Sequence, residues 1–401
     1  MTGNLLSGLK IVEAGDSVST AFCGKLLAGL GAEVITVEPP GGNALRRLAP
    51  HHENSVGPDR SILSTWLSAN KKSVTLDLDQ EHGKAILREL LRKSNALIRT
   101  RGVLANENLQ SVHRGLTVTT LSPFGSEGPY ADYHANDLVL FAMSGFAYYL
   151  SSPVSDPATT PPTKNPGRQV SLVAGLRAAS ATLWGLFAAD RKGEGVNVDV
   201  SELEAFTYLL YQYTAHVANN TLPPDRKQKP GAVITIVGGL VWCLPCADGW
   251  AMISPREDHQ FQRWGEVIGQ PGWLEKPEFS TSARREENAW EIYEQSAAWT
   301  RVRRKHDVFR AAQEKKVACF PVSEMRDLPE LEQLRHRGFF TEIDHSVIRG
   351  VRYPGFPVRI DGAHVPDSER SPQLGQHSRE VYAALEMLSD EIDALSRRGV
   401  I

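Results

Sequence analysis

The chain has 401 residues, enough to bury a sizeable core and to divide into two domains. A hydrophobic fraction of 41% and a charged fraction of 23% are ordinary for a soluble globular protein, and a net charge of -3 argues against a general nucleic-acid binder. The sequence shows no apolar signal core, no apolar run of membrane-spanning length and only four cysteines. We therefore expect a cytoplasmic protein without a membrane partner.

A β-α-β pattern opens the chain. Residues 10–13 predict a short buried strand, and Ser19 or Thr20 is placed to cap the helix that follows. Gly31 is a natural stop for that helix, and residues 33–38 predict a second strand. Such units build parallel sheets, which bind ligands at the carboxyl ends of their strands.

Strands and helices keep alternating as far as residue 218. Further strands are predicted at 73–78, 96–98, 116–121 and 196–200. An apolar stripe predicts a helix around 86–91, a long helix opens near Val173, and Ser201 with Glu204 fits a capping box. This alternation predicts an α/β fold whose large domain is an open, doubly wound, Rossmann-like parallel sheet over residues 1–218.

The pattern changes after a linker rich in proline and lysine, which we place at 219–232. Short strands around Asp248–Gly249 and charged helical sequence follow, so we predict a small α+β domain at 233–328. Residues 329–401 are predicted to be a second linker that returns to the large domain.

Several phrases along the chain together resemble the family III CoA-transferases, the group that holds formyl-CoA transferase, carnitine CoA-transferases and alpha-methylacyl-CoA racemase. The phrases are 6–13, 22–28, 30–35, 37–42, 70–73, 76–77, 124–125, 128–130, 144–145, 173–179 and 354–357. The resemblance spans nearly the whole chain. It implies the same two-domain fold, and a dimer whose two chains interlock like chain links.

The resemblance also locates the position of the family's nucleophile. Family members move CoA between carboxylic acids through an aspartate that forms a mixed anhydride and then an aspartyl-CoA thioester. The phrase 173–176 puts Ser171 at that position, and no aspartate or glutamate lies between Lys164 and Ala189. An acyl-serine is an ester without a carbon that can receive CoA, so Ser171 cannot take over the role.

The resemblance further implies a set of CoA-binding positions: Val18, Ser19, Leu76, Asp77, Thr100, Arg101, His134, Asn136 and Asp137. Asp137 matches an acidic residue that lies beside the nucleophile in transferases. Alternatively, it is a carboxylate at the start of a helix, where it accepts hydrogen bonds from backbone amides. Racemases have His-Asp where this chain has Asn136-Asp137, so racemisation is not expected.

One arginine that helps to hold the CoA phosphates in the family has no counterpart here. Arg99 and Arg101 are either nearby replacements or solvated surface arginines.

Weaker patterns point to other functions. Gly15-Asp16-Ser17, Asn136-Asp137 and the segment 361–364 imitate the blocks of Gly-Asp-Ser-type esterases, in which serine is the nucleophile and a late histidine its base. The first strand-to-helix turn lacks the glycines of a dinucleotide site. Cys243 and Cys246 have the spacing of a metal knuckle, but no second ligand pair follows, so no metal is expected.

These observations predict the non-catalytic subunit of a heteromeric CoA-transferase, as in the two-subunit benzylsuccinate CoA-transferases. A homologous partner would carry the catalytic aspartate. A homodimeric CoA-ester-binding protein, or an enzyme of altered chemistry, is the alternative, followed by a stand-alone transferase that uses another carboxylate. CoA esters are candidate ligands, and no covalently bound cofactor is expected.

Overall fold

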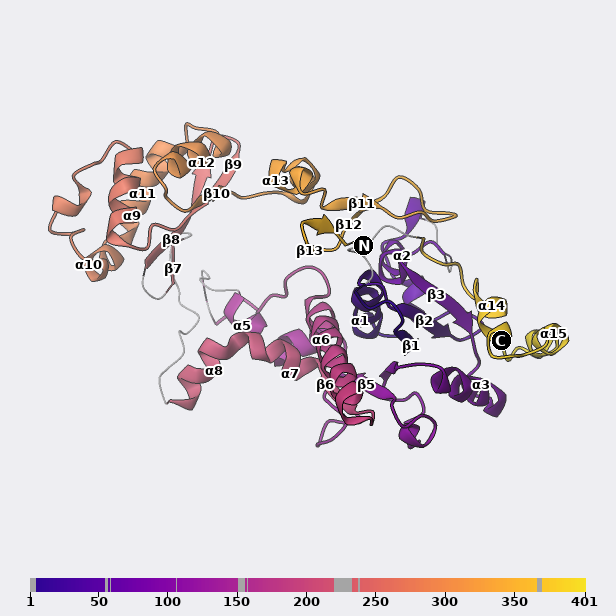
Figure 1. The fold of residues 1–401 in the computed structure, drawn as a ribbon. Coiled ribbons are helices and arrows are strands. Elements are labelled where there is room, and N and C mark those ends of the chain that lie inside the picture. Colours follow the sequence, from indigo (N-terminus) through magenta and orange to yellow (C-terminus); the bar gives the residue numbers. More distant parts are fainter. Residues whose placement is uncertain are drawn as a thin grey trace. The chain divides into compact units, whose positions relative to one another are not determined.

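The computed structural model describes residues 5–54, 57, 59–105, 107–150, 156, 158–219, 233–236, 239–365 and 370–401. The chain forms two compact units (Figure 1). One comprises Met1–Leu150, Thr163–Pro223 and Gln333–Ile401, and the other Ser151–Pro162 and Pro224–Glu332. The predicted linker 219–232 lies outside the described residues, except for Asn219.

The first unit is built on a parallel sheet with the strand order β3-β2-β1-β4-β5-β6. The strands are β1 (Lys10–Ala14), β2 (Glu33–Glu38), β3 (Lys71–Thr75), β4 (Ala96–Thr100), β5 (Thr117–Ser122) and β6 (Asn197–Ser201). Every pairing in this sheet is parallel. This order is that of a doubly wound Rossmann-like sheet, whose direction of winding reverses between β1 and β4. The predicted fold class is confirmed.

Alternate residues of a strand point to opposite faces of the sheet, and here both faces are buried. Ile11 and Ile98 belong to the core under α1 (Val18–Gly29) and α6 (Gln169–Lys192). Val12 and Leu97 belong to a second core, which α3 (Glu81–Arg92) and the C-terminal helices complete.

The remaining helices of this unit, with η for 3₁₀ helices, are η1 (Ala44–Arg47), η2 (His52–Asn54), α2 (Ile62–Ser68), η3 (Leu109–Ser111), α4 (Asp137–Met143), α5 (Phe146–Leu150), α7 (Glu202–Thr207), η4 (Tyr208–Leu210), α8 (Tyr211–Ala218), α14 (Ser378–Ala383) and α15 (Ser389–Arg397). Its short C-terminal strands are β11 (Phe340–Glu342), β12 (Arg352–Pro354), β13 (Arg359–Ile360) and β14 (Ala363–His364).

Local chemistry moves several boundaries away from the prediction. Ser17 caps α1, not Ser19 or Thr20. Its side chain accepts a hydrogen bond from the Thr20 amide, because the helix begins directly after it, at Val18. Strand β3 covers Lys71–Thr75 rather than 73–78, because the chain then leaves the sheet: the Asp77 amide donates to the Val400 carbonyl. Helix α6 begins at Gln169, before the predicted opening.

Helix α6 is long and apolar enough to cross a membrane by length and composition. It packs instead against α1 and the sheet. One close approach is at Gly175, where an added Cβ would lie 2.7 Å from the Ser19 carbonyl oxygen. We conclude that α6 is the core helix of this unit, and that its second turn packs against the start of α1.

Two buried ion pairs connect the strands to surrounding segments. The Lys71 ammonium lies 2.7 Å from a Glu13 carboxylate oxygen and donates to the Ala21 carbonyl at 2.7 Å. Arg46 donates to both oxygens of Glu38 at 2.7 Å and to Asp59 at 2.7 Å. A buried charge is tolerated only when it is paired and hydrogen-bonded, as both of these cations are.

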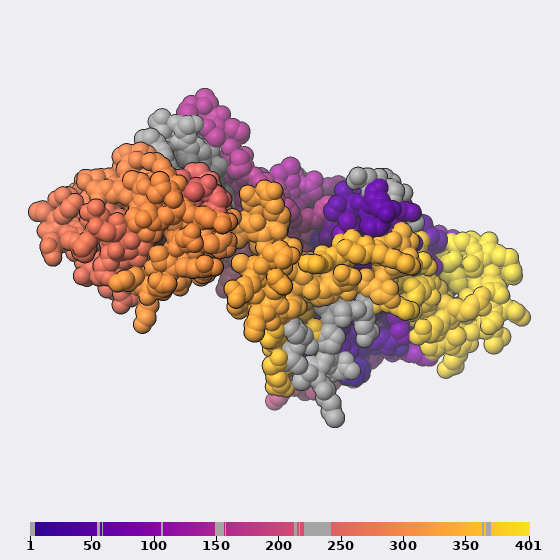
Figure 2. Space-filling model, turned by 90° about the horizontal axis from the view of Figure 1, so that it is seen from above, coloured from indigo at the N-terminus to yellow at the C-terminus, as the bar shows by residue number. Residues whose placement is uncertain are grey.

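The C-terminal residues return to the edge of this sheet. His377 accepts from the Ser73 amide at 3.2 Å, and the Tyr382 hydroxyl donates to the Thr75 carbonyl at 2.5 Å. Figure 2 shows the yellow C-terminal segment at the surface of this unit. The contacts seal the edge strand β3, which would otherwise expose unpaired backbone groups.

The second unit has an antiparallel sheet with the order β10-β9-β8-β7. Its elements are β7 (Val233–Ile236), β8 (Gly239–Cys246), β9 (Gly249–Ile253), α9 (Asp258–Val267), η5 (Trp273–Glu275), α10 (Ser282–Glu287), α11 (Ala289–Thr300), α12 (Lys305–Glu314), β10 (Cys319–Pro321) and η6 (Met325–Glu330), and α13 (Glu332–His336) leads back to the first unit. Three buried tryptophans, Trp242, Trp264 and Trp273, dominate its core.

Adjacent lysines on β3 provide a test of the buried pair. Lys71→Met leaves Glu13 buried without a counter-ion, so we expect the free energy of unfolding in urea to fall by about 3–5 kcal/mol. Lys72→Met is the matched control, because the Lys72 side chain is 32% exposed and its two glutamate partners lie at the surface. Its loss should be below about 1 kcal/mol. Equal effects of the two changes would contradict this assignment of stability.

Candidate functional site

A cavity of about 830 Å³ lies at the carboxyl ends of β1, β4 and β5. Asp16 and Val18 line it after β1, Thr100 and Arg101 at the end of β4, and Pro123 after β5. This is the point where the winding of the sheet reverses, and open α/β sheets bind their ligands there. The fold therefore places the candidate site.

The starts of two helices meet at one wall of this cavity. Asn136 caps α4 by accepting from the Leu138 and Val139 amides. Asp137, the first residue of α4, is thereby free to reach across to α6. Its Oδ1 accepts from the Ser171 amide at 3.0 Å and from the Ser171 hydroxyl at 3.2 Å. The carboxylate thus caps a neighbouring helix rather than its own.

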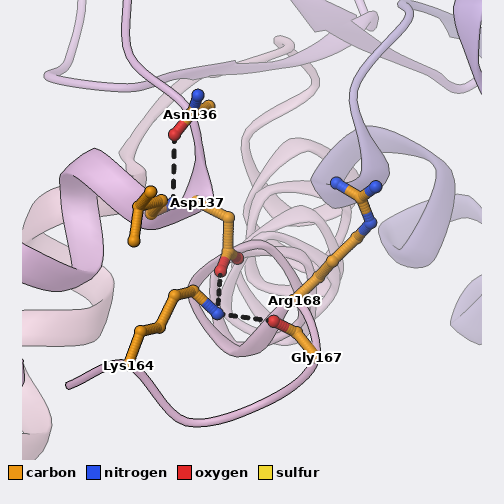
Figure 3. A pocket seen from close by; sticks show the side chains of 6 residues that line it. Asn136, Asp137, Lys164, Gly167 and Arg168 are labelled. Carbon is orange, nitrogen blue, oxygen red and sulfur yellow. Dashed lines mark hydrogen bonds and ion pairs between the residues drawn. The ribbon is translucent and has the colours of Figure 1, made fainter.

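The second oxygen of Asp137 is held by a cation. Lys164 Nζ lies 3.0 Å from Oδ2 and also donates to the Gly167 carbonyl at 2.6 Å (Figure 3). Asp137 is only 8% exposed, and these residues line a smaller pocket of about 440 Å³. With both oxygens engaged, the carboxylate is a poor nucleophile and a strong structural anchor.

Glu202 adds a second buried carboxyl group to the cavity wall. It lies in the first turn of α7, and the buried Ser19 hydroxyl donates to its Oε1. Burial raises the pKa of Glu202 above its ordinary value, the Ser19 hydrogen bond lowers it in part, and the charge of Asp137 raises it further. Glu202 can therefore hold a proton in the folded protein when an exposed glutamate would have lost one.

The cavity brings together six of the nine predicted CoA-binding residues: Val18, Thr100, Arg101, His134, Asn136 and Asp137. Ser19 is fully buried and bonds to Glu202. Leu76 is fully buried in the core under α3, and Asp77 accepts from Asp79 and Gln80 near the start of that helix. Leu76 and Asp77 do not line the cavity, and the part of all nine residues in CoA binding stays a prediction.

The two arginines considered for the CoA phosphates have different environments. Arg99 donates to the Val103 and Leu104 carbonyls and to Thr120, and burial lowers its pKa. It is a structural residue rather than a solvated one. Arg101 lines the cavity and pairs with Asp132 at 2.8 Å, so it is the one of the two that a ligand can reach.

The weaker patterns have structural explanations. Ser17 is the N-cap of α1, and the late Asp361–His364 segment includes the short strand β14. Cys243 and Cys246 lie on β8, and Cys23 is fully buried in the core under α1. Within the described ranges no group of three or more potential metal ligands occurs.

Three residues of the site were not predicted from the sequence: Lys164, Arg168 and Glu202. Glu202 directly follows a parallel strand, which is the position where ligand-binding residues gather, so a signal was present. Lys164 and Arg168 lie in irregular sequence before α6. Only the folded chain brings Arg168 to the wall of the large cavity and both residues to the smaller pocket.

Comparisons with known proteins place this open α/β chain in a family. The profile of CoA-transferase family III matches residues 6–378. The succinyl-CoA:(R)-benzylsuccinate CoA-transferase subunit BbsE of Thauera aromatica is 31% identical over 398 residues, which cover 95% of this chain and 94% of that protein. The succinate–glutarate CoA-transferase of Agrobacterium fabrum is 26% identical, with 96% of each chain covered.

A solved structure has the same fold. A CAIB/BAIF family protein from Brucella suis superposes with a TM-score of 0.80 and 22% identity, covering 96% of this chain and 100% of that one. The chain described here belongs to CoA-transferase family III. CoA esters are accordingly the ligands consistent with its family.

Glu202 makes the stability of the folded chain depend on pH in a definite direction. An acid whose pKa is raised by folding contributes stability that is present below its unfolded value of 4.5 and is lost as pH rises through the folded value. Glu202→Gln keeps the acceptor for Ser19 without the charge. We expect its urea stability to match the wild type at pH 4 and to exceed it at pH 8.

The control for this prediction is Glu204→Gln. Glu204 lies in the same helical turn but is exposed, so its replacement should leave the pH dependence unchanged. A Glu202→Gln profile parallel to that of the wild type from pH 4 to pH 8 would contradict the assignment.

Proposed function

We propose that this chain is the non-catalytic subunit of a heteromeric CoA-transferase that moves CoA between carboxylic acids. The observation that carries the proposal is Ser171, which stands at the family's nucleophile position in the first turn of α6. Its amide and hydroxyl are both occupied by Asp137.

Covalent transfer of CoA needs a carboxyl carbon as the carrier. An acyl group on the Ser171 hydroxyl would be an ester, and CoA could only remove that acyl group again. In the proposed assembly a homologous partner supplies an aspartate, which takes the acyl group and then CoA. This chain completes the fold of the dimer.

The unit that holds the cavity also carries a surface suited to such a partner. Large apolar side chains are exposed on α6 and on the η4–α8 segment, among them Leu176, Trp184, Phe187, Tyr208 and Tyr211. Exposed apolar groups of this size mark interaction surfaces. The relative from Thauera aromatica is itself named as a subunit, and we extend its subunit character to this chain as an interlocked heteromer in the cytoplasm.

The second candidate is a transferase that works without such a partner and uses Asp137 as the carrier. The approach of Asp137 to Ser171 favours it, because the carboxyl group lies next to the family's reaction centre. Against it, both Asp137 oxygens are held by Lys164 and Ser171, and freeing one would break a buried ion pair. A homodimer that binds CoA esters without transferring CoA is the remaining alternative.

The rate of the assembled heteromer tests the role of Ser171. The pure chain should not exchange CoA between succinyl-CoA and other acids, whereas the heteromer should. Ser171→Ala in this chain should leave the heteromer's rate at saturating donor and acceptor within a few fold. A loss beyond about a hundredfold with assembly intact would place Ser171 in the chemistry.

Asp137→Asn is the companion variant. It should change turnover little and lower the free energy of unfolding by about 1 kcal/mol or more, since a helix cap and the partner of Lys164 are weakened. A large loss of rate at an unchanged melting temperature would favour the second candidate, in which Asp137 carries CoA.

A further inference from the structure

Arg168 differs from the other charged residues around the cavity. It is the N-cap residue of α6, three residues before Ser171, and it is partly buried. Figure 3 shows its side chain directed away from Asp137 and Lys164, which pair with each other. In the part of the chain that the structure describes, its guanidinium has no hydrogen bond or ion pair.

The other charges that line the large cavity are accounted for, with one exception. Arg101 pairs with Asp132, Asp137 pairs with Lys164, and Glu202 holds a hydrogen bond from Ser19 in a buried place. Asp16 remains, but it is exposed to solvent at the rim and is strongly screened there. A guanidinium facing a partly closed cavity without a partner is a site for an anion.

The walls of the same cavity indicate what kind of anion fits. Val18, Leu45, Leu48, Leu121 and Pro123 form an apolar lining. Apolar walls beside an arginine without a partner suit a hydrocarbon body that ends in a carboxylate. An inorganic anion would leave those walls uncovered.

We propose that Arg168 determines specificity by binding the free carboxylate of an acyl group derived from a dicarboxylic acid. The inference rests on the proposed function: in the heteromer this chain would bind the acyl group, and the partner's aspartate would carry CoA. The carboxyl group that carries CoA is an uncharged thioester, so an acyl group from a monocarboxylic acid offers nothing to a guanidinium. A dicarboxylic acid retains one carboxylate, and Arg168 is placed to pair with it while the hydrocarbon portion lies on the apolar walls.

Binding of two small probes to the full chain tests this proposal without any turnover. Monomethyl succinate has an uncharged ester at one end, in place of the thioester, and a carboxylate at the other. Methyl succinamate has an uncharged amide instead of that carboxylate. We expect the wild type to bind monomethyl succinate about ten- to a hundredfold more tightly in calorimetry, the range for a hydrogen bond to a charged group.

Variants of Arg168 connect that preference to the guanidinium. Arg168→Gln should bind both probes equally, and Arg168→Lys, which keeps the charge, should retain part of the preference even if the Gln variant is less stable. Arg191→Gln removes an exposed arginine near the other end of α6 and should change nothing.

Absence of any preference in the wild type, including failure to bind either probe, would overturn the proposal. An unchanged preference in Arg168→Gln would overturn it too. The proposed function fails separately, through a heteromer that does not transfer CoA or a pure chain that does.

Discussion

The carboxylate of Asp137 joins the starts of two helices, and the geometry of the site depends on it. Its oxygens bind the amide and hydroxyl of Ser171 on one side and the ammonium of Lys164 on the other. A negative charge is favourable at the start of α6, where unpaired amides and the helix dipole concentrate positive potential. In this chain that negative group comes from α4, as a carboxylate with one hydrogen-bonded oxygen and one ion-paired oxygen.

In the proposed non-catalytic subunit, that arrangement would keep the form of the site without a nucleophile. The first turn of α6 is bound by Asp137, and its second turn packs closely on α1 at Gly175. With a serine at position 171, Asp137 is the residue that brings a negative group to this helix start. The cavity at the sheet reversal is lined by Arg168 and Glu202, so a chain without the carrier, as proposed, can still bind a ligand there.

Much of the fold could be predicted from the sequence, because strand and helix periodicities and the glycine-bounded turns are local signals. The parallel sheet is of this kind. The cap of α1 was assigned to the wrong hydroxyl because Ser17, Ser19 and Thr20 have similar capping chemistry. Only the residue at which the helix begins, Val18, decides among them. Glu202 and Arg168 escaped notice because their roles arise from contacts between distant segments: Ser19 and Glu202 are 183 positions apart.

The most direct test of the account is to find which chain carries the covalent intermediate. The purified heteromer would be incubated with succinyl-CoA and treated with hydroxylamine, which converts a carboxyl thioester or anhydride to a hydroxamate, and the peptides of both chains would then be examined by mass spectrometry. The account predicts a modified aspartate in the partner and none in this chain. A hydroxamate on Asp137, or on any other carboxylate of this chain, would contradict it.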